Sequence, residues 1–463
     1  MKSTAGRPFL MQVYILMALL TGLAGQYSDL FEKAQGIDFY QYWGIGIALK
    51  SGRVPDANPY RHEKLIQSTL NEIVDHTTGD PRLKAANKYR RDDLEFAGTP
   101  LLFSLWSLVR VESFSTAFFW FSFGKLILFL SGVVLLRRVA GLDTLTALLS
   151  GMALLLLFLP ATSDFLMGNI NLTQFFGISV VAWLCHRLRS GDGSDGWMTA
   201  FLILSAASFF VLLKPNIFLV LPLMVLHVLA RLDWRLAWRV VIAAAGVVAC
   251  WLIFPMLQLD SATIWLEWYH KVLAPGGVQG NVAVWRPLSE GNVSIHAYLQ
   301  SVAGATPGHL AWGLLLFFVT TFLVALSLHF WRARVDVGSS FWVGLRALFA
   351  DGPLMLIVAL VLSTALNPLV WLHYLVVMIV PGLFLIAAEG RGSQLLGLVT
   401  LVCASDLIGP FILYLGGLIS VSEHMVLFVA LHALRKTLLA FVWLPAWVGV
   451  LSRVAGRGPV VAD

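Results

Sequence analysis

Long apolar runs, separated by shorter polar segments, dominate the chain. A helix needs roughly 20 apolar residues to cross the hydrocarbon of a bilayer. The runs therefore predict about twelve membrane spans, near residues 9–25, 117–136, 142–160, 171–188, 197–213, 215–231, 238–257, 309–330, 353–370, 372–388, 395–415 and 425–451. The stretch 99–111 (TPLLFSLWSLVRV) is too short to span easily and predicts a re-entrant or interfacial helix. The expected fold class is an all-α polytopic membrane protein.

Two longer polar regions interrupt these runs, at about 26–98 and 258–309. Within the first, HEKLIQSTLNEIV (62–74) has the apolar spacing of a helix, so both regions are expected to contain short helices lying on the membrane. There are no internal repeats and there is no separate soluble segment. We therefore expect a single integral-membrane domain over residues 1–463.

Basic residues in short loops predict the orientation, because such loops stay in the cytoplasm. They fall on one side of the predicted spans, at Lys2, Arg7, Arg137, Arg138, Arg187, Arg189, Arg231, Arg235, Arg239, Arg332, Arg334, Arg391, Arg453 and Arg457. Both termini are then cytoplasmic and the two long regions lie outside. The first long region is also basic, but long loops cross the membrane largely regardless of charge.

Composition narrows the class of protein. Of 463 residues, 58% are hydrophobic and 13% are charged, against about 25% charged in a soluble domain. The net charge of +6 suits contact with anionic lipid headgroups or a lipid phosphate. The basic residues are scattered between apolar spans, which argues against nucleic acid as a partner. The three cysteines lie in apolar surroundings with no disulfide or zinc spacing. No cofactor is expected, and a divalent metal is left open. Residues 1–25 could imitate a signal peptide, but a retained first helix fits the later spans better.

The stretch GIDFYQYWGIGIALKSG (36–52) places Asp38 before Tyr40, Tyr42 and Trp43, directly after the first predicted span. A carboxylate there could accept a proton from a substrate. Asp is also a favoured helix N-cap, and the two roles are compatible.

Other polar residues stand at the outer ends of predicted spans. Lys214 lies between two apolar runs, and a charge in such a place suggests function, although a snorkelling lysine is equally consistent. Asn169, Asn171 and Gln174 cluster at a predicted helix start, where amides could bind hydroxyls or phosphate or serve as ordinary caps. Asp164 could orient a substrate, bind a metal or cap a helix.

Two further segments carry candidate side chains. Arg286 and His296 lie in RPLSEGNVSIHAY; Arg suits phosphate, and for His296 a solvated loop position is preferred. His373 follows NPLVWL, and an intramembrane histidine tends to face a cavity. Lys125, Asp406 and His432 are also expected within the membrane, without an assigned role.

The motifs together resemble a known family. DFYQYW (38–43) with NPY (58–60), GNINLTQ (168–174), LKPNIFLVLPL (213–223), GNVSIHAYL (291–299) and NPLVWLHYLVVMIVP (367–381) are similar to glycosyltransferase family 87 of the GT-C superfamily, in the family's order.

The resemblance implies a GT-C fold and an inverting transfer of a hexose, most often mannose, from a polyprenyl-phosphate donor. The acceptor is a lipid or glycan at the outer face of the cytoplasmic membrane, and Asp38 is the general base. Implied donor contacts are Lys214, Arg286, His373, Asn169, Asn171 and Gln174. Implied sugar or acceptor contacts are Tyr40, Tyr42, Trp43, Tyr60, Asp164, Asn292 and Ser294. Two alternatives stay open: a multi-spanning transporter or flippase, and a structural membrane protein without chemistry.

Overall fold

The computed structural model describes residues 17, 21, 32, 34–55, 58–92, 94, 96–109, 111–141, 143–190, 196–273, 292–303, 307–333, 339–367, 370–388, 390–418 and 424–456. Within these residues the regular elements are helices, and the one isolated bridge joins Asn292 to Trp371. The all-α expectation is confirmed for this part of the chain. The first predicted span, 9–25, lies almost entirely outside it, as do Arg286 and Gly291.

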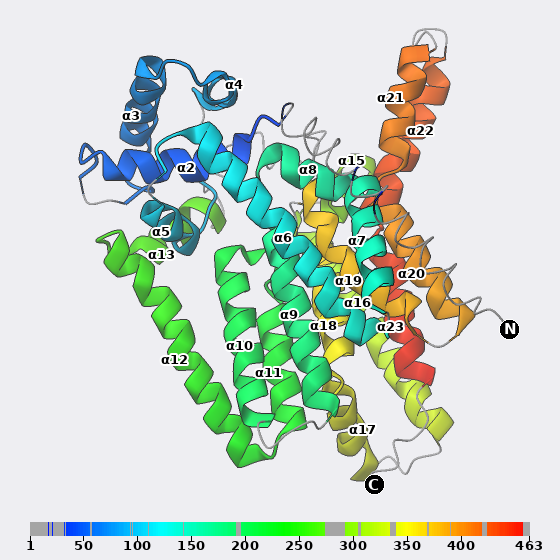
Figure 1. The fold of residues 1–463 in the computed structure, drawn as a ribbon. Helices are drawn as coiled ribbons and strands as arrows, with labels where there is room; N and C mark the ends of the chain where they lie inside the picture. The colour runs from blue at the N-terminus through cyan, green and yellow to red at the C-terminus, as the bar shows by residue number, and fades with distance from the viewer. Residues whose placement is uncertain are drawn as a thin grey trace, which may run out of the picture.

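Seven short elements lie toward one end of the molecule. They are α2 (Ile37–Lys50), α3 (Glu63–His76), α4 (Pro81–Arg90), α5 (Pro100–Leu108), α13 (Ile264–Trp268), the π-helix η2 (Tyr269–Leu273) and α15 (Ile295–Ala303). Figure 1 shows α2, α3 and α4 at its upper left with α5 and α13 just below them. We call this end the outer end. The predicted helix at 62–74 is confirmed as α3, and the segment 99–111 forms only the nine-residue α5.

The remaining helices form a bundle next to the outer end. Its first half contains α6 (Phe114–Ala140), α7 (Thr144–Leu157), α8 (Leu159–Met167), α9 (Asn171–Ser190), α10 (Gly196–Leu213), η1 (Pro215–Ile217), α11 (Val220–Arg231) and α12 (Trp234–Gln258). Its second half contains α16 (Pro307–Ala333), α17 (Ser339–Phe349), α18 (Gly352–Leu366), η4 (Leu372–Met378), α19 (Ile379–Ile386), α20 (Arg391–Ala404), α21 (Ile408–Leu418), α22 (Met425–Ala440) and α23 (Trp443–Gly456).

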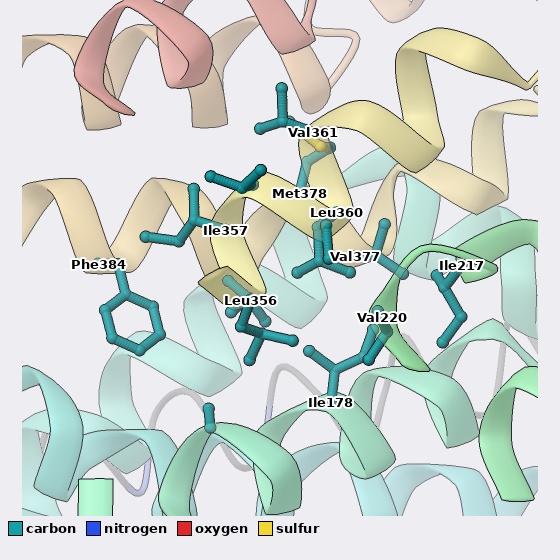
Figure 2. Close-up of a cluster of buried hydrophobic side chains, with 14 of the residues drawn as sticks. Ile178, Ile217, Val220, Leu356, Ile357, Leu360, Val361, Val377, Met378 and Phe384 are labelled. Carbon is teal, nitrogen blue, oxygen red and sulfur yellow. The ribbon is translucent and has the colours of Figure 1, made fainter. Parts of the chain in front are cut away.

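Helix α18 lies at the centre of the bundle because its sequence has no polar face. Every residue from Gly352 to Val361 is buried, as expected of a helix that is apolar all round. Figure 2 shows its side chains Leu356, Ile357 and Leu360 meeting Ile178 of α9 and Val377 of η4. This core fixes the second half of the bundle against the first.

A second, aromatic core holds the outer end together. Phe39 of α2 lies 5.1 Å from Trp106 of α5 and 4.9 Å from Phe121 of α6, measured between ring centroids. Phe114 and Phe118, at the start of α6, pack on the same ring. Such ring pairs contribute about 0.5–1.5 kcal/mol each beyond the area they bury, so α2 is held firmly on α5 and α6.

The apolar helices place the protein in a membrane, but several predicted spans are broken. Within the described residues, four helices are long and apolar enough to cross a membrane, or up to six if each bent pair counts as one span. The number twelve stays a prediction. The segment 142–160 divides at Phe158, where Pro160 follows and removes a backbone donor. The segment 395–415 divides at Asp406, whose φ is 54°.

The break at Asp406 separates α20 from α21, and α21 and α22 rise above their neighbours in Figure 1. At the break, the Arg435 guanidinium of α22 donates to both carboxylate oxygens of Asp406, at 2.6 to 3.0 Å. The pair satisfies the charge of a buried carboxylate. Asp406 therefore has a structural partner, and His432 lies on the same helix as Arg435, three residues earlier.

The basic ends of the helices gather opposite the outer end. Arg231 donates to the carbonyl of Arg189, which joins α11 to α9, and Arg346 of α17 donates to the carbonyls of Ala230 and Leu232. Arg189 and Arg231, two of the arginines that predict the orientation, thus lie together in the structure. Which side of a membrane they face stays a prediction.

Candidate active site

Two glycines bring α2 against the junction of α8 and α9. The Gly36 amide donates to the carbonyl of Leu166 at 3.0 Å, and Gly36 has the positive φ of 61° that favours glycine. Gly168 ends α8 with a φ of 73°, and a Cβ there would lie 2.6 Å from Phe39 Cβ. The close approach sets Asp38, which precedes Phe39, beside Asn169, which follows Gly168.

Asp38 lies in the first turn of α2 and is not its N-cap. Gly36 occupies the cap position, so the capping alternative is wrong. The Asp38 carboxylate instead accepts a hydrogen bond from Asn169 Nδ2 at 2.7 Å and lies 3.5 Å from the Arg90 guanidinium of α4. Its side chain is 16% exposed. A carboxylate held in this way is oriented and still accessible.

Asn169 joins four of the candidate side chains. Its Nδ2 lies 3.3 Å from His373 Nε2 as well as 2.7 Å from Asp38. Its Oδ1 accepts from Lys214 Nζ at 2.6 Å and from Asn171 Nδ2 at 3.2 Å. Because the amide donates on one side and accepts on the other, it holds a carboxylate and an ammonium group in fixed positions a few ångströms apart.

Lys214 lies where α10 stops. The following Pro215 disfavours a helical conformation for the residue before it, and Lys214 is extended, with a φ of −155°. Its Nζ donates to Asn171 Oδ1 at 2.9 Å and lies 4.0 Å from the ring centre of Tyr374. Gln174 Nε2 donates to the Lys214 carbonyl at 2.7 Å. The ammonium group therefore points into the site instead of snorkelling away from it.

Below these residues lies a fully buried ion pair. Lys125 Nζ donates to Asp164 Oδ1 at 2.9 Å and to the carbonyls of Asp164 and Asn169, and the two side chains are 1% and 0% exposed. Asp164 Oδ2 accepts from the backbone and side-chain amides of Asn171, both at 2.9 Å. Asp164 thus caps the start of α9, as one of its predicted roles requires, and Lys125 fixes the Asn169 backbone.

The aromatic candidates are packed into the outer core. Tyr40, Tyr42 and Trp43 are 0%, 8% and 4% exposed, and Trp43 Nε1 donates to the Val111 carbonyl at 3.0 Å. The Tyr60 hydroxyl donates to the Gly98 carbonyl at 2.6 Å, and burial raises the pKa of that phenol well above its ordinary value. The structure gives these rings partners within the protein.

The GNVSIHAYL segment lies against the segment that carries His373. Asn292 Oδ1 accepts from the amides of Val370 and Ser294, both at 3.1 Å, and the Val293 amide donates to the Val370 carbonyl at 2.8 Å. His296 is 5% exposed, so its predicted place in a solvated loop is wrong. Asn292 and Ser294 therefore brace the backbone next to Trp371.

Arg90 is a site residue that sequence reasoning missed. It is close in sequence to Lys84, Lys88 and Arg91 in the first long region. Charge alone does not indicate which of these basic residues belongs to the site. Its position depends on how α4 docks on α2, which the sequence pattern does not reveal.

The arrangement combines a proton acceptor with cations at the outer end of an apolar bundle. Among the described side chains that bond directly in it, three cations, Lys125, Lys214 and Arg90, face two carboxylates, Asp38 and Asp164. The described residues contain no group of three or more His, Cys, Asp or Glu side chains that could hold a metal ion. No protein-family model, curated protein or solved structure matches the chain.

Proposed function

We propose that the protein is a membrane glycosyltransferase that moves a hexose, mannose in the first instance, from a polyprenyl-phosphate donor to a hydroxyl group of a lipid or glycan acceptor. The observation that supports this proposal most is the hydrogen bond from Asn169 Nδ2 to the Asp38 carboxylate. The same Asn169 side chain also contacts His373 and Lys214, so one amide group connects the carboxylate with both of them. A proton acceptor beside a cation is what the transfer requires.

In this mechanism Asp38 takes the proton of the acceptor hydroxyl. The hydroxyl oxygen forms a bond to the anomeric carbon from the face opposite the phosphate. The bond between that carbon and the phosphate oxygen breaks, and its electron pair leaves with the polyprenyl phosphate. Lys214 stabilises the charge that develops on this leaving group, and attack from the opposite face inverts the anomeric configuration. A donor that carries its own lipid reaches such a site along the membrane surface.

The test measures turnover by the Asp38→Asn variant in membranes. Radiolabelled polyprenyl-phosphate hexoses are supplied as donors, and thin-layer separation measures how much of each donor is consumed. An amide oxygen can still accept the bond from Asn169 but cannot take the proton, so we expect a loss of about 10²–10⁴-fold. Asp75→Asn is the matched control, because Asp75 lies in the same outer region and pairs with Arg91 instead. Near-normal turnover by Asp38→Asn at normal expression would overturn the proposal.

A transporter or flippase is the second candidate, favoured by the buried Lys125–Asp164 pair inside the bundle. A transporter would move the lipid-linked sugar across proteoliposomes and leave it intact. A transferase would release polyprenyl phosphate only when acceptor is present.

A further inference from the structure

Helices α9, α11 and α18 approach one another closely at the end of the bundle where Arg189 and Arg231 lie, opposite the candidate active site. All three are labelled in the lower half of the bundle in Figure 1. Gly352, the first residue of α18, permits this approach, because a Cβ there would lie 2.6 Å from His227 Nε2 and 2.9 Å from Cys185 Sγ. The thiol of α9 and the imidazole of α11 therefore face the same small region beside Gly352.

A third side chain with a lone pair joins this pair. Cys185 Sγ lies 3.6 Å from Met224 Sδ of α11. Met224 and His227 are three residues apart, so they share a face of α11. Cys185 is a free cysteine, and the three side chains are only 0–1% exposed. A thiol, a thioether and an imidazole thus meet in the interior of the bundle.

The imidazole of His227 has the hydrogen bonding of a metal ligand. Its Nδ1 lies 3.1 Å from the carbonyl of Phe349, which can only accept, so Nδ1 carries the proton of the neutral ring. The Nε2 lone pair is then left over, and Nε2 is buried without a hydrogen-bond partner among the described residues. Histidines that bind metals usually donate their other nitrogen to a carbonyl or carboxylate in this way.

The chemistry of the three groups selects the class of ion. Thiolate and thioether sulfur are soft ligands that favour Cu(I). Zinc sites are built from cysteine, histidine and carboxylate side chains, and this group has only two of those, since its third member is Met224. The methionine therefore favours a soft monovalent ion over zinc.

We propose that Cys185, Met224 and His227 bind one Cu(I) ion between α9 and α11, beside the start of α18. On binding, the Cys185 thiol releases its proton to solvent and its sulfur bonds to the ion as a thiolate. Met224 Sδ and His227 Nε2 each donate a lone pair, and no oxidation state changes. The ion joins α9 to α11 and stabilises the folded bundle. This site is separate from Asp38 and does not rest on the proposed function.

The test titrates the full-length protein in detergent with Cu(I), without oxygen, in competition with the chelator bathocuproine disulfonate. The wild type should bind one ion per chain. Met224→Leu keeps the volume of the side chain and removes the thioether, and Cys185→Ala removes the thiol. Each should weaken Cu(I) binding about 100-fold or more, since losing even an indirect partner of a metal site costs about 10- to 100-fold.

The exposed Cys250 provides the matched control. Cys250→Ala should bind Cu(I) as the wild type does, and elution volume checks that each variant is folded. Loss of binding in Cys250→Ala, or equal affinities of the wild type and Met224→Leu, would overturn the site. Zn(II) binding as tight as that of Cu(I) would overturn its assignment to a soft ion.

Two further measurements report on the bound ion directly. X-ray absorption at the copper edge should show two sulfur ligands and one nitrogen ligand, and a single sulfur would exclude Met224. Added Ag(I), a soft ion that stays monovalent, should raise the thermal midpoint of the wild type, because a ligand that binds the folded state stabilises it. The same rise in Met224→Leu would show adventitious binding and contradict the proposal.

Discussion

Lys214 contacts several groups of the site at once. Its ammonium contacts two amide oxygens and an aromatic ring, and its carbonyl accepts from Gln174. The contacts pin the charge in place, which suits a residue that stabilises a leaving phosphate.

We expect Lys214→Met to lower kcat/KM for the donor about 10- to 100-fold, because a charge-assisted contact contributes about 1.5–3 kcal/mol. Methionine keeps an unbranched apolar side chain over Tyr374 but carries no charge. Lys214→Arg should lose less than Lys214→Met. The exposed Lys64 offers the control Lys64→Met, which should not change donor use. Equal activity of the Met and Arg variants would argue against a role for the charge.

The buried Lys125–Asp164 pair should contribute to the free energy of unfolding. Removing one partner of a buried pair costs about 3–5 kcal/mol, since the other charge is left without a partner. Lys125→Met should therefore lower the free energy of unfolding by that amount. Adding Asp164→Asn removes the orphaned charge but keeps an oxygen for the Asn171 amide, so part of the stability should return. A double-mutant cycle in detergent measures this recovery, and purely additive losses would contradict the coupling.

At the residue scale, the sequence revealed those side chains that are unusual for their surroundings. Asp38, Asn169, Lys214 and His373 are polar groups at the ends of apolar runs, and the structure brings them together. Arg90 could not be selected in the same way, because its role depends on a tertiary contact made by Asn87.

At the scale of elements, the positions of helices followed from apolar runs, but their continuity did not. A run of apolar residues does not reveal a break such as that at Asp406, which depends on the partner Arg435 on another helix. The proline at 160 is a visible signal for the break at Phe158. Hydropathy averages over such single positions and therefore predicts one span where the structure has two helices.

The junction of α8 and α9 predicts a difference between two glycines with similar backbones. Gly168 and Gly141 have φ values of 73° and 67°, and both end helices. A Cβ at Gly168 would meet Phe39 at 2.6 Å, whereas nothing lies within 4 Å at Gly141. Both alanine variants incur the left-handed strain of about 1–2 kcal/mol. Only Gly168→Ala should also displace α2 and reduce turnover.

The measurement is turnover per folded molecule, with the thermal midpoint recorded for each variant. Gly141→Ala should show a lowered midpoint and normal turnover. Equal turnover of the two variants would show that the position of α2 tolerates this displacement, contrary to the argument that the glycine sets Asp38 in place.

For the whole molecule, polar contacts join the two outer regions far apart in the chain. Glu267 accepts from Arg61 Nε at 2.7 Å and from the side chain of Asn58, and Thr263 donates to it at 2.8 Å. Partial burial opposes ionisation of Glu267, but these hydrogen bonds outweigh it and hold the pKa of Glu267 below its ordinary value.

A lowered carboxylate pKa stabilises the fold above the unfolded value of about 4.3, and this contribution is lost as the pH falls through the lower folded pKa. The thermal midpoints of the wild type and of Glu267→Gln should therefore differ at pH 6 and converge toward pH 3. Glu72→Gln breaks an exposed pair with Arg53 and should show little difference at either pH. A gap for Glu267→Gln that persists at pH 3 would contradict this assignment.

The orientation of the whole molecule makes a separate prediction. Alkaline phosphatase fused after Asp75 should be active outside the cell, and the same reporter fused after Asp233 should be inactive, because the arginines near Asp233 favour the cytoplasm. The opposite pattern would put Asp38 on the wrong side for a lipid-linked donor that is used outside.

The contacts of Asn169 join residues that the ribosome synthesises at very different times. In the chain, 131 residues separate Asp38 from Asn169 and a further 204 separate Asn169 from His373. At roughly 5–20 residues per second, Asp38 is synthesised on the order of 20 to 70 s before His373. Arg90 also lies within the first quarter of the chain. The Asp38 carboxylate and the Arg90 guanidinium are therefore both synthesised long before Asn169 and His373. A nascent chain that stops after α18 therefore already carries Asp38, Asn169 and Lys214, but it does not yet carry His373.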